Sequence, residues 1–93
     1  MNIEASEKVY VVLAKWVPPG WLEVVEQFNP PEGDIAYPYM RAAYAAAQAR
    51  TTTSVEYCAC ILQNSIHTGC QFNRITENAT IVDQLILQSA KPT

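Results

Sequence analysis

Four side chains that can bind a transition metal occur within thirteen residues of the chain, namely Cys58, Cys60, His67 and Cys70. Thiolates and imidazoles at short spacing are the usual ligands of zinc, but structural sites favour two cysteines separated by two to four residues. On a helix, Cys58 and Cys60 would point about 200° apart and could not reach one ion, whereas on a strand they would share a face. Because we expect a helix here, we expect no metal site and no cofactor.

The same helical phase assigns the thiols to different environments. It places Cys58 and Cys70 in the core and leaves Cys60 and His67 on a polar surface. Nucleophilic catalysis by a cysteine needs an imidazole within hydrogen-bond reach of the thiol, and His67 is the only histidine of the chain. Since no orienting acid or oxyanion site accompanies them, we expect no catalytic residues and no enzyme activity.

Aromatic residues beside prolines are the strongest candidates for binding. Trp16 and Trp21 flank the turn at residues 18–20, and Tyr37 and Tyr39 enclose a further proline. Rigid turns can present aromatic side chains as anchors for a partner. We therefore predict that Trp16, Trp21, Tyr37 and Tyr39 line a pocket for a ligand or a partner. In the alternative, both tryptophans are core residues, because each lies on the apolar stripe of its own predicted helix.

The spacing of apolar residues predicts the elements that position these side chains. Five segments have the periodicity of amphipathic helices, namely residues 3–17, 21–28, 36–50, 54–68 and about 76–89. Thr53-Ser54-Val55-Glu56 matches a capping box, which is typical of a helix start. The third segment is rich in alanine, the strongest helix former. Prolines, which end helices, separate several of the segments. The sequence thus predicts a single helical domain over residues 1–93. Its fold class is all-α, a small bundle of four or five short helices joined by proline-rich turns.

A second interpretation is an α+β fold in which residues 8–16 and 54–62 are strands. Val9, Val11 and Leu13 alternate along the first of these segments, and its β-branched and aromatic residues have high β propensity. The strand interpretation leaves the capping box unexplained. The helical interpretation is therefore preferred.

The composition excludes several classes of protein. With 49% hydrophobic and 16% charged residues, the chain is not an intrinsically disordered one. A net charge of −3 and a pI near 4.9 argue against nucleic-acid binding, and no window of about 18 residues is apolar enough to span a membrane. Three cysteines are an odd number, which argues against a disulfide framework. Because the acidic start also lacks the features of a secretory signal, we expect a cytoplasmic protein.

The distribution of charge indicates self-association. Residues 1–50 hold ten charged side chains and residues 51–93 hold five, and depletion of charge is typical of interface cores. Ile61 and Leu87 lie off the apolar stripes of their predicted helices and would be exposed in a monomer. We expect a non-enzymatic, acidic protein–protein interaction module, either a homodimer formed through Ile61 and Leu87 or an adaptor to another protein. The alternative is a small-molecule binding protein with an aromatic pocket near Pro18-Pro19.

Overall fold

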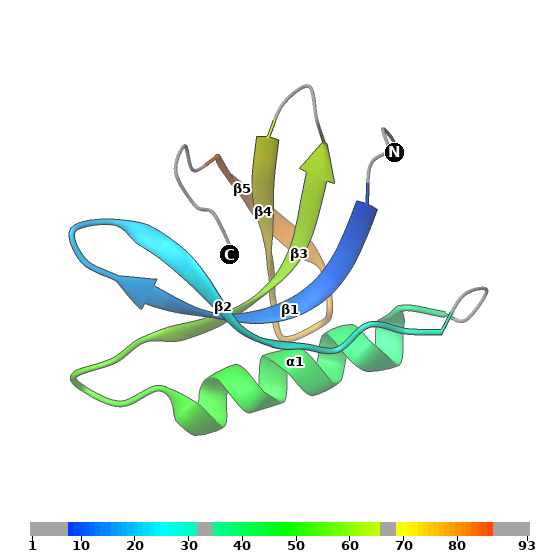
Figure 1. Cartoon of the computed structure of the whole chain (residues 1–93). Helices are drawn as coiled ribbons and strands as arrows, with labels where there is room; N and C mark the ends of the chain where they lie inside the picture. The colour runs from blue at the N-terminus through cyan, green and yellow to red at the C-terminus, as the bar shows by residue number, and fades with distance from the viewer. Residues whose placement is uncertain (1–7, 32–34, 66–68, 87–93) are drawn as a thin grey trace.

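The described part of the chain forms one antiparallel sheet of five strands, accompanied by one helix. The computed structural model describes residues 8–31, 35–65 and 69–86. Along the chain the elements are β1 (Lys8–Val17), β2 (Trp21–Gln27), α1 (Tyr37–Arg50), β3 (Tyr57–Ser65), β4 (Gly69–Ile75) and β5 (Ile81–Ile86) (Figure 1). The strand order across the sheet is β2-β1-β3-β4-β5. Each strand is antiparallel to its neighbours, so that β1–β2 is a hairpin and β3–β4–β5 a meander.

The prediction of an all-α bundle is wrong. Strands β1, β2, β3 and β5 occupy four of the five segments that were expected to be helical. The α+β alternative, with strands over residues 8–16 and 54–62, is nearer to the structure, but its second strand begins three residues too early, since β3 begins at Tyr57. The helix predicted over residues 36–50 is confirmed as α1, with a proline in its first turn.

Burial on both faces explains why the apolar pattern of β1 resembles that of a helix. Four consecutive residues, Val11, Val12, Leu13 and Ala14, are at most 2% exposed. A strand in the middle of a sheet can be covered on both sides, which removes the alternation of apolar and polar residues. The remaining signal is the content of β-branched and aromatic residues, which in β1 is high.

Helix α1 lies along one face of the sheet, against β1 and β3 (Figure 1). Ala43 and Ala47 are its buried residues, and they pack with Val11, Leu13 and Ala59. These small side chains allow the helix backbone to approach the sheet closely. Within the described residues, no helix reaches the length and apolarity that a membrane crossing requires.

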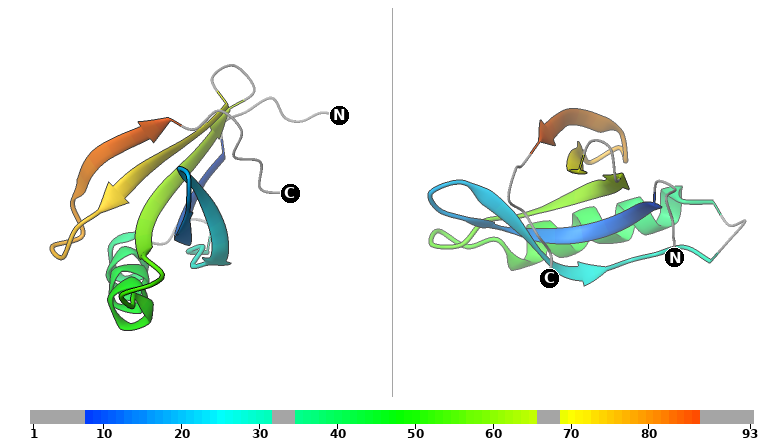
Figure 2. Two further views of the ribbon diagram at one scale, coloured as in Figure 1. Left: turned by 90° about the vertical axis from the view of Figure 1, so that its left-hand side faces the viewer. Right: turned by 45° about the horizontal axis from the view of Figure 1, so that its top comes forward.

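A second apolar cluster occupies the face of the sheet opposite to α1. Its members are at most 5% exposed and come from four adjacent strands: Val12, Ala14, Leu22, Cys60, Leu62 and Phe72. Both views in Figure 2 show the sheet strongly coiled rather than flat. Coiling follows from the twist of the strands, and it brings side chains of β2 and β4 around those of β1 and β3. This face is therefore a core in its own right.

Candidate functional site

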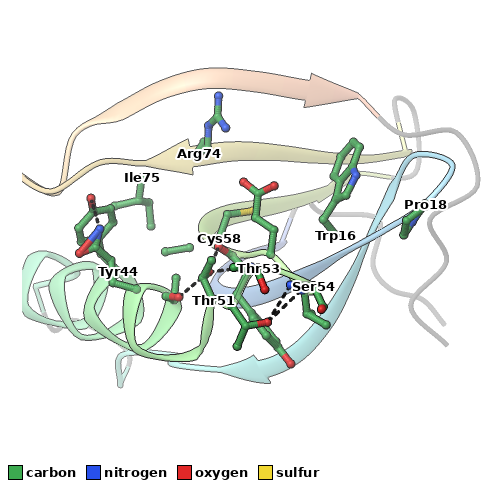
Figure 3. A pocket seen from close by; sticks show the side chains of 16 residues that line it. Trp16, Pro18, Tyr44, Thr51, Thr53, Ser54, Cys58, Arg74 and Ile75 are labelled. Carbon is green, nitrogen blue, oxygen red and sulfur yellow. Dashed lines mark hydrogen bonds between the residues drawn. The ribbon is translucent and has the colours of Figure 1, made fainter.

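A groove opens at the end of the sheet where α1 ends and β3 begins (Figure 3). It has a volume of about 720 Å³. Its walls come from the end of β1, the last turns of α1, residues 51–56 and the adjoining parts of β3 and β4. The lining residues that matter most for its chemistry are Trp16, Tyr44, Thr51, Glu56, Cys58 and Arg74.

Two hydrogen-bonded links hold the segment between α1 and β3 in place. The Thr51 hydroxyl donates to the Ala47 carbonyl (2.8 Å) and accepts from the Tyr57 N–H (3.0 Å), which joins the last turn of α1 to the first residue of β3. The Trp16 N–H donates to the Glu56 carbonyl (2.9 Å), which joins the same segment to β1. The groove wall is thus tied to both the helix and the sheet.

The predicted capping box does not begin a helix. The residues that follow Thr53-Ser54-Val55-Glu56 form strand β3. The preceding residue, Thr52, stabilises a turn instead, because its hydroxyl accepts from the N–H groups of Ser54 (3.2 Å) and Val55 (3.0 Å). Threonine hydroxyls bond nearby backbone N–H groups in turns as well as at helix starts. The pattern at residues 53–56 therefore marks a turn and not a helix start, and the hydroxyl that stabilises the turn lies one residue earlier, at Thr52.

The four predicted pocket aromatics lie at different places in the fold. Trp16 lines the groove. The register pairs Trp16 with Leu22, so Trp16 and Trp21 project from opposite faces of the hairpin. Tyr37 and Tyr39 lie in the first turn of α1, at the end of the helix away from the groove. Of the four residues, the structure brings Trp16 alone to the groove, and binding by the other three stays a prediction.

Two thiols meet on one face of β3. The Sγ atoms of Cys58 and Cys60 are 3.6 Å apart. Cys60 is fully buried in the second apolar cluster, whereas Cys58 is half-buried and lines the groove. This placement corrects the sequence prediction, which put Cys58 in the core and Cys60 on the surface. The alternation of a strand, in place of the rotation of a helix, is the physical reason.

The hydrogen bond between the two thiols and their surroundings shift their pKa values in opposite directions. The hydrogen bond with Cys60 lowers the pKa of Cys58, and the Arg74 guanidinium lowers it further against the opposing effects of burial and Glu56. The same hydrogen bond, together with burial, raises the pKa of Cys60. Arg74 lies opposite Cys60 in the register of β3 and β4, and an ion pair with Asp83 raises its pKa. The groove therefore holds a thiol whose pKa is lowered, beside a guanidinium.

The four candidate metal ligands do not gather at one point. Cys58 and Cys60 share a face, as expected of a strand. Cys70 lies four residues along β4 from Arg74, which pairs with Cys60, and at about 3.3 Å per residue this separates it from the pair by about 13 Å. His67 lies outside the described residues. Across residues 8–31, 35–65 and 69–86, no group of three His, Cys, Asp or Glu side chains is placed to hold a metal ion.

The two residues predicted to mediate self-association are not both described. Ile61 is half-buried and packs against the cluster formed by Ala43, Ala47 and their neighbours on the α1 side of the sheet. Leu87 lies outside the described residues. Self-association through this pair stays a prediction, with Ile61 placed beside the helix.

Sequence reasoning missed most residues of the groove, among them Arg74, Tyr44 and Thr51. Arg74 is the only lysine or arginine between positions 51 and 90, and that isolation is a signal that could have marked it. The Tyr44 hydroxyl accepts from the Gln48 side-chain amide (3.0 Å). Because alanines surround Tyr44 on every side of the helix, the apolar spacing does not single it out.

Comparisons with known protein families, with curated proteins and with solved structures found no match. The function therefore rests on the geometry of the groove and on the chemistry of its lining. The groove is lined by the exposed indole of Trp16, the hydroxyls of residues 51–54, the half-buried thiol of Cys58 and the guanidinium of Arg74.

Thr51→Val should destabilise the protein by about 1 kcal/mol, because it removes the hydroxyl that joins α1 to β3 and leaves the Tyr57 N–H without this acceptor. Urea denaturation measures the change. Thr53→Val is the matched control, since Thr53 is exposed, and it should stay within about 0.5 kcal/mol of the parent. Equal unfolding midpoints for the two variants would contradict the assigned role of Thr51.

Proposed function

We propose that this is a non-enzymatic binding protein and that its groove holds a small organic ligand. The ligand has a flat apolar part that stacks on Trp16 and an acceptor group that the Arg74 guanidinium binds. The observation that carries the proposal is the groove itself. It has a volume of about 720 Å³, and its lining includes an indole and a guanidinium. Sites for small ligands typically have volumes of about 300–1,000 Å³ and combine apolar walls with a few polar groups.

Trp16 suits the role of a stacking surface. The residue is 39% exposed, although its backbone is held on both sides. Leu22 is its register partner in β2, and Glu56 accepts its backbone N–H. A rigid aromatic side chain loses little entropy on binding, and stacking contributes about 0.5–1.5 kcal/mol beyond the burial of apolar area.

Arg74 supplies the polar end of the site. A guanidinium has five N–H donors in a planar fork, and the ion pair with Asp83 engages the Nη2 atom. Trp16, Cys58 and Arg74 come from the three adjacent strands β1, β3 and β4. Figure 3 shows Trp16 and Arg74 on the same side of the sheet. A ligand that reaches from one to the other passes over Cys58.

Three cysteines outside any disulfide support a location in a reducing compartment, which we propose is the cytoplasm. Cys58, Cys60 and Cys70 form no disulfide. Oxidising compartments favour disulfides in small proteins, whereas the cytosol keeps thiols reduced.

The probe 8-anilinonaphthalene-1-sulfonate tests the groove, because it joins flat aromatic rings to an anionic acceptor. Its fluorescence should rise on titration with the folded protein. Trp16→Ala should weaken its binding about fivefold to tenfold, the factor that corresponds to a loss of about 1–1.4 kcal/mol. Far-UV circular dichroism of each variant confirms that the sheet is retained.

Trp21→Ala is the matched control for this titration. Trp21 is 40% exposed, lies in the same hairpin and projects from the opposite face. Its removal should leave the affinity for the probe unchanged. Equal losses in both variants, or no binding by the parent, would refute the proposed site.

Self-association through the outer edge of the sheet is the second candidate function. β5 is the last strand in the sheet order, and Ile81 and Val82 at its start are 49% and 55% exposed. An edge strand with exposed apolar side chains is a ready template for pairing with another chain. We propose that a second copy pairs there, in the half of the chain that is poor in charge.

Light scattering at about 100 μM protein should then give the mass of a dimer, and the dimer fraction should rise with concentration. Val82→Lys should shift the protein to monomer, because lysine on an edge strand opposes pairing. Val25→Lys, on the opposite edge strand, is the control and should not change the mass. A monomeric parent protein would eliminate this candidate.

A further inference from the structure

We infer that Cys58 and Cys60 form an oxidation-sensitive thiol pair, in which a hydroperoxide oxidises Cys58 and Cys60 then closes a reversible disulfide with it. This inference goes beyond the proposed ligand binding and does not depend on it. It assigns a modification site to the C-x-C motif of β3, with a hydroperoxide as the class of oxidant.

The geometry gives each thiol a different access to an oxidant. Cys58 is half-buried and lines the groove, so we expect a small oxidant to reach it from there. Cys60 is fully buried behind it. The Sγ atoms are 3.6 Å apart, so the buried Cys60 thiol is within contact distance of a sulfenic acid that forms on Cys58. Oxidation-sensing cysteines typically combine an accessible thiolate with a neighbouring resolving cysteine.

The charges around Cys58 favour its thiolate, which is the nucleophilic form. The groups that face it are Cys60 on the same strand, Glu56 on the preceding segment, Arg74 on β4 and, through its ion pair with Arg74, Asp83 on β5. The Cys60 hydrogen bond and the Arg74 charge lower the pKa of Cys58, and Glu56 and burial oppose them only in part. The net effect raises the fraction of thiolate at neutral pH.

The chemistry has two steps. The Cys58 thiolate attacks one peroxide oxygen, the O–O bond breaks, and the leaving oxygen takes up a proton as water or an alcohol, so that Cys58 becomes a sulfenic acid. The Cys60 sulfur then attacks the Cys58 sulfur, the S–O bond breaks, and the oxygen leaves as water with the proton that Cys60 gives up. Overall, two thiols are oxidised to one disulfide and one peroxide is reduced.

The strand places the two thiols at the edge of the usual disulfide geometry. Residues two apart on a strand have Cα atoms about 6.6 Å apart, within but close to the upper limit of about 6.8 Å for a disulfide. Disulfides at the edge of the usual geometry are more easily reduced than structural ones, so we expect this one to be reversible.

Cys70 provides an internal reference thiol. It lies on β4, about 13 Å from the pair by the register of β3 and β4. Oxidation that depends on the geometry of the pair should therefore leave Cys70 as a thiol. Oxidation that reflects only general thiol reactivity should not distinguish the three cysteines.

The test exposes the reduced full-length protein to one equivalent of hydrogen peroxide, followed by alkylation in denaturant and intact-mass measurement. The parent should lose the mass of two hydrogen atoms, keep one alkylatable thiol, and regain all three after reduction. Peptide mapping should place the disulfide between Cys58 and Cys60. Three remaining thiols, a disulfide that includes Cys70, or a disulfide between two copies would overturn the inference.

Variants separate the roles of the two thiols. Cys60→Ala, which keeps the buried position apolar, should accumulate a sulfenic acid at Cys58 that dimedone traps, and Cys58→Ser should form no disulfide. Cys70→Ser is the matched control and should be oxidised at the parent rate. Arg74→Gln should move the pH profile of Cys58 oxidation to higher pH. An unchanged pH profile in a folded Arg74→Gln variant would contradict the mechanism. Oxidation of Cys60 in Cys58→Ser as fast as the oxidation of the parent would contradict it as well.

Discussion

The position of β3 at the centre of the sheet is the constraint on which the rest of the structure depends. β3 pairs with β1 on one side and with β4 on the other, so its residues must alternate between the two faces. Ala59 packs under α1, whereas Cys60 and Leu62 enter the opposite core. If β3 were shifted by one residue relative to its neighbours, the residues that face α1 and those that face the opposite core would be exchanged. The same register sets Ala14 opposite Cys58 and Arg74 opposite Cys60.

The groove follows from this register and from the way the chain enters β3. Trp16, Cys58 and Arg74 meet because three neighbouring strands present them near one end, and Thr51 fixes the segment that closes that end. The proposed ligand binding and the proposed thiol oxidation would use different parts of the same arrangement. The indole and the guanidinium would hold a ligand, and the buried Cys60 would resolve an oxidised Cys58. Both proposals therefore depend on the strand geometry of β3.

The sequence predicts the local features of this fold better than its long-range ones. Alanine content and a proline in the first turn mark α1 correctly. The double proline draws attention to Trp16, which lines the groove, but its role in binding stays a prediction. Burial on both faces hides the strand character of β1. In β3, apolar residues happen to match a helical spacing, and a turn signal near Thr53 imitates a cap. The pairing of Arg74 with Cys60 depends on register between strands, which spacing along the chain does not encode.

The backbone of residues 57–65 is the most direct test of the account, and two-dimensional nuclear Overhauser spectroscopy measures it. We predict cross-peaks between backbone protons of β3 and those of both neighbours, with Cys60 close to Val12 on one side and to Arg74 on the other. Strong sequential amide–amide cross-peaks over residues 57–65, as in a helix, without contacts to β1 and β4, would contradict the central position of β3. They would also contradict the shared face of Cys58 and Cys60.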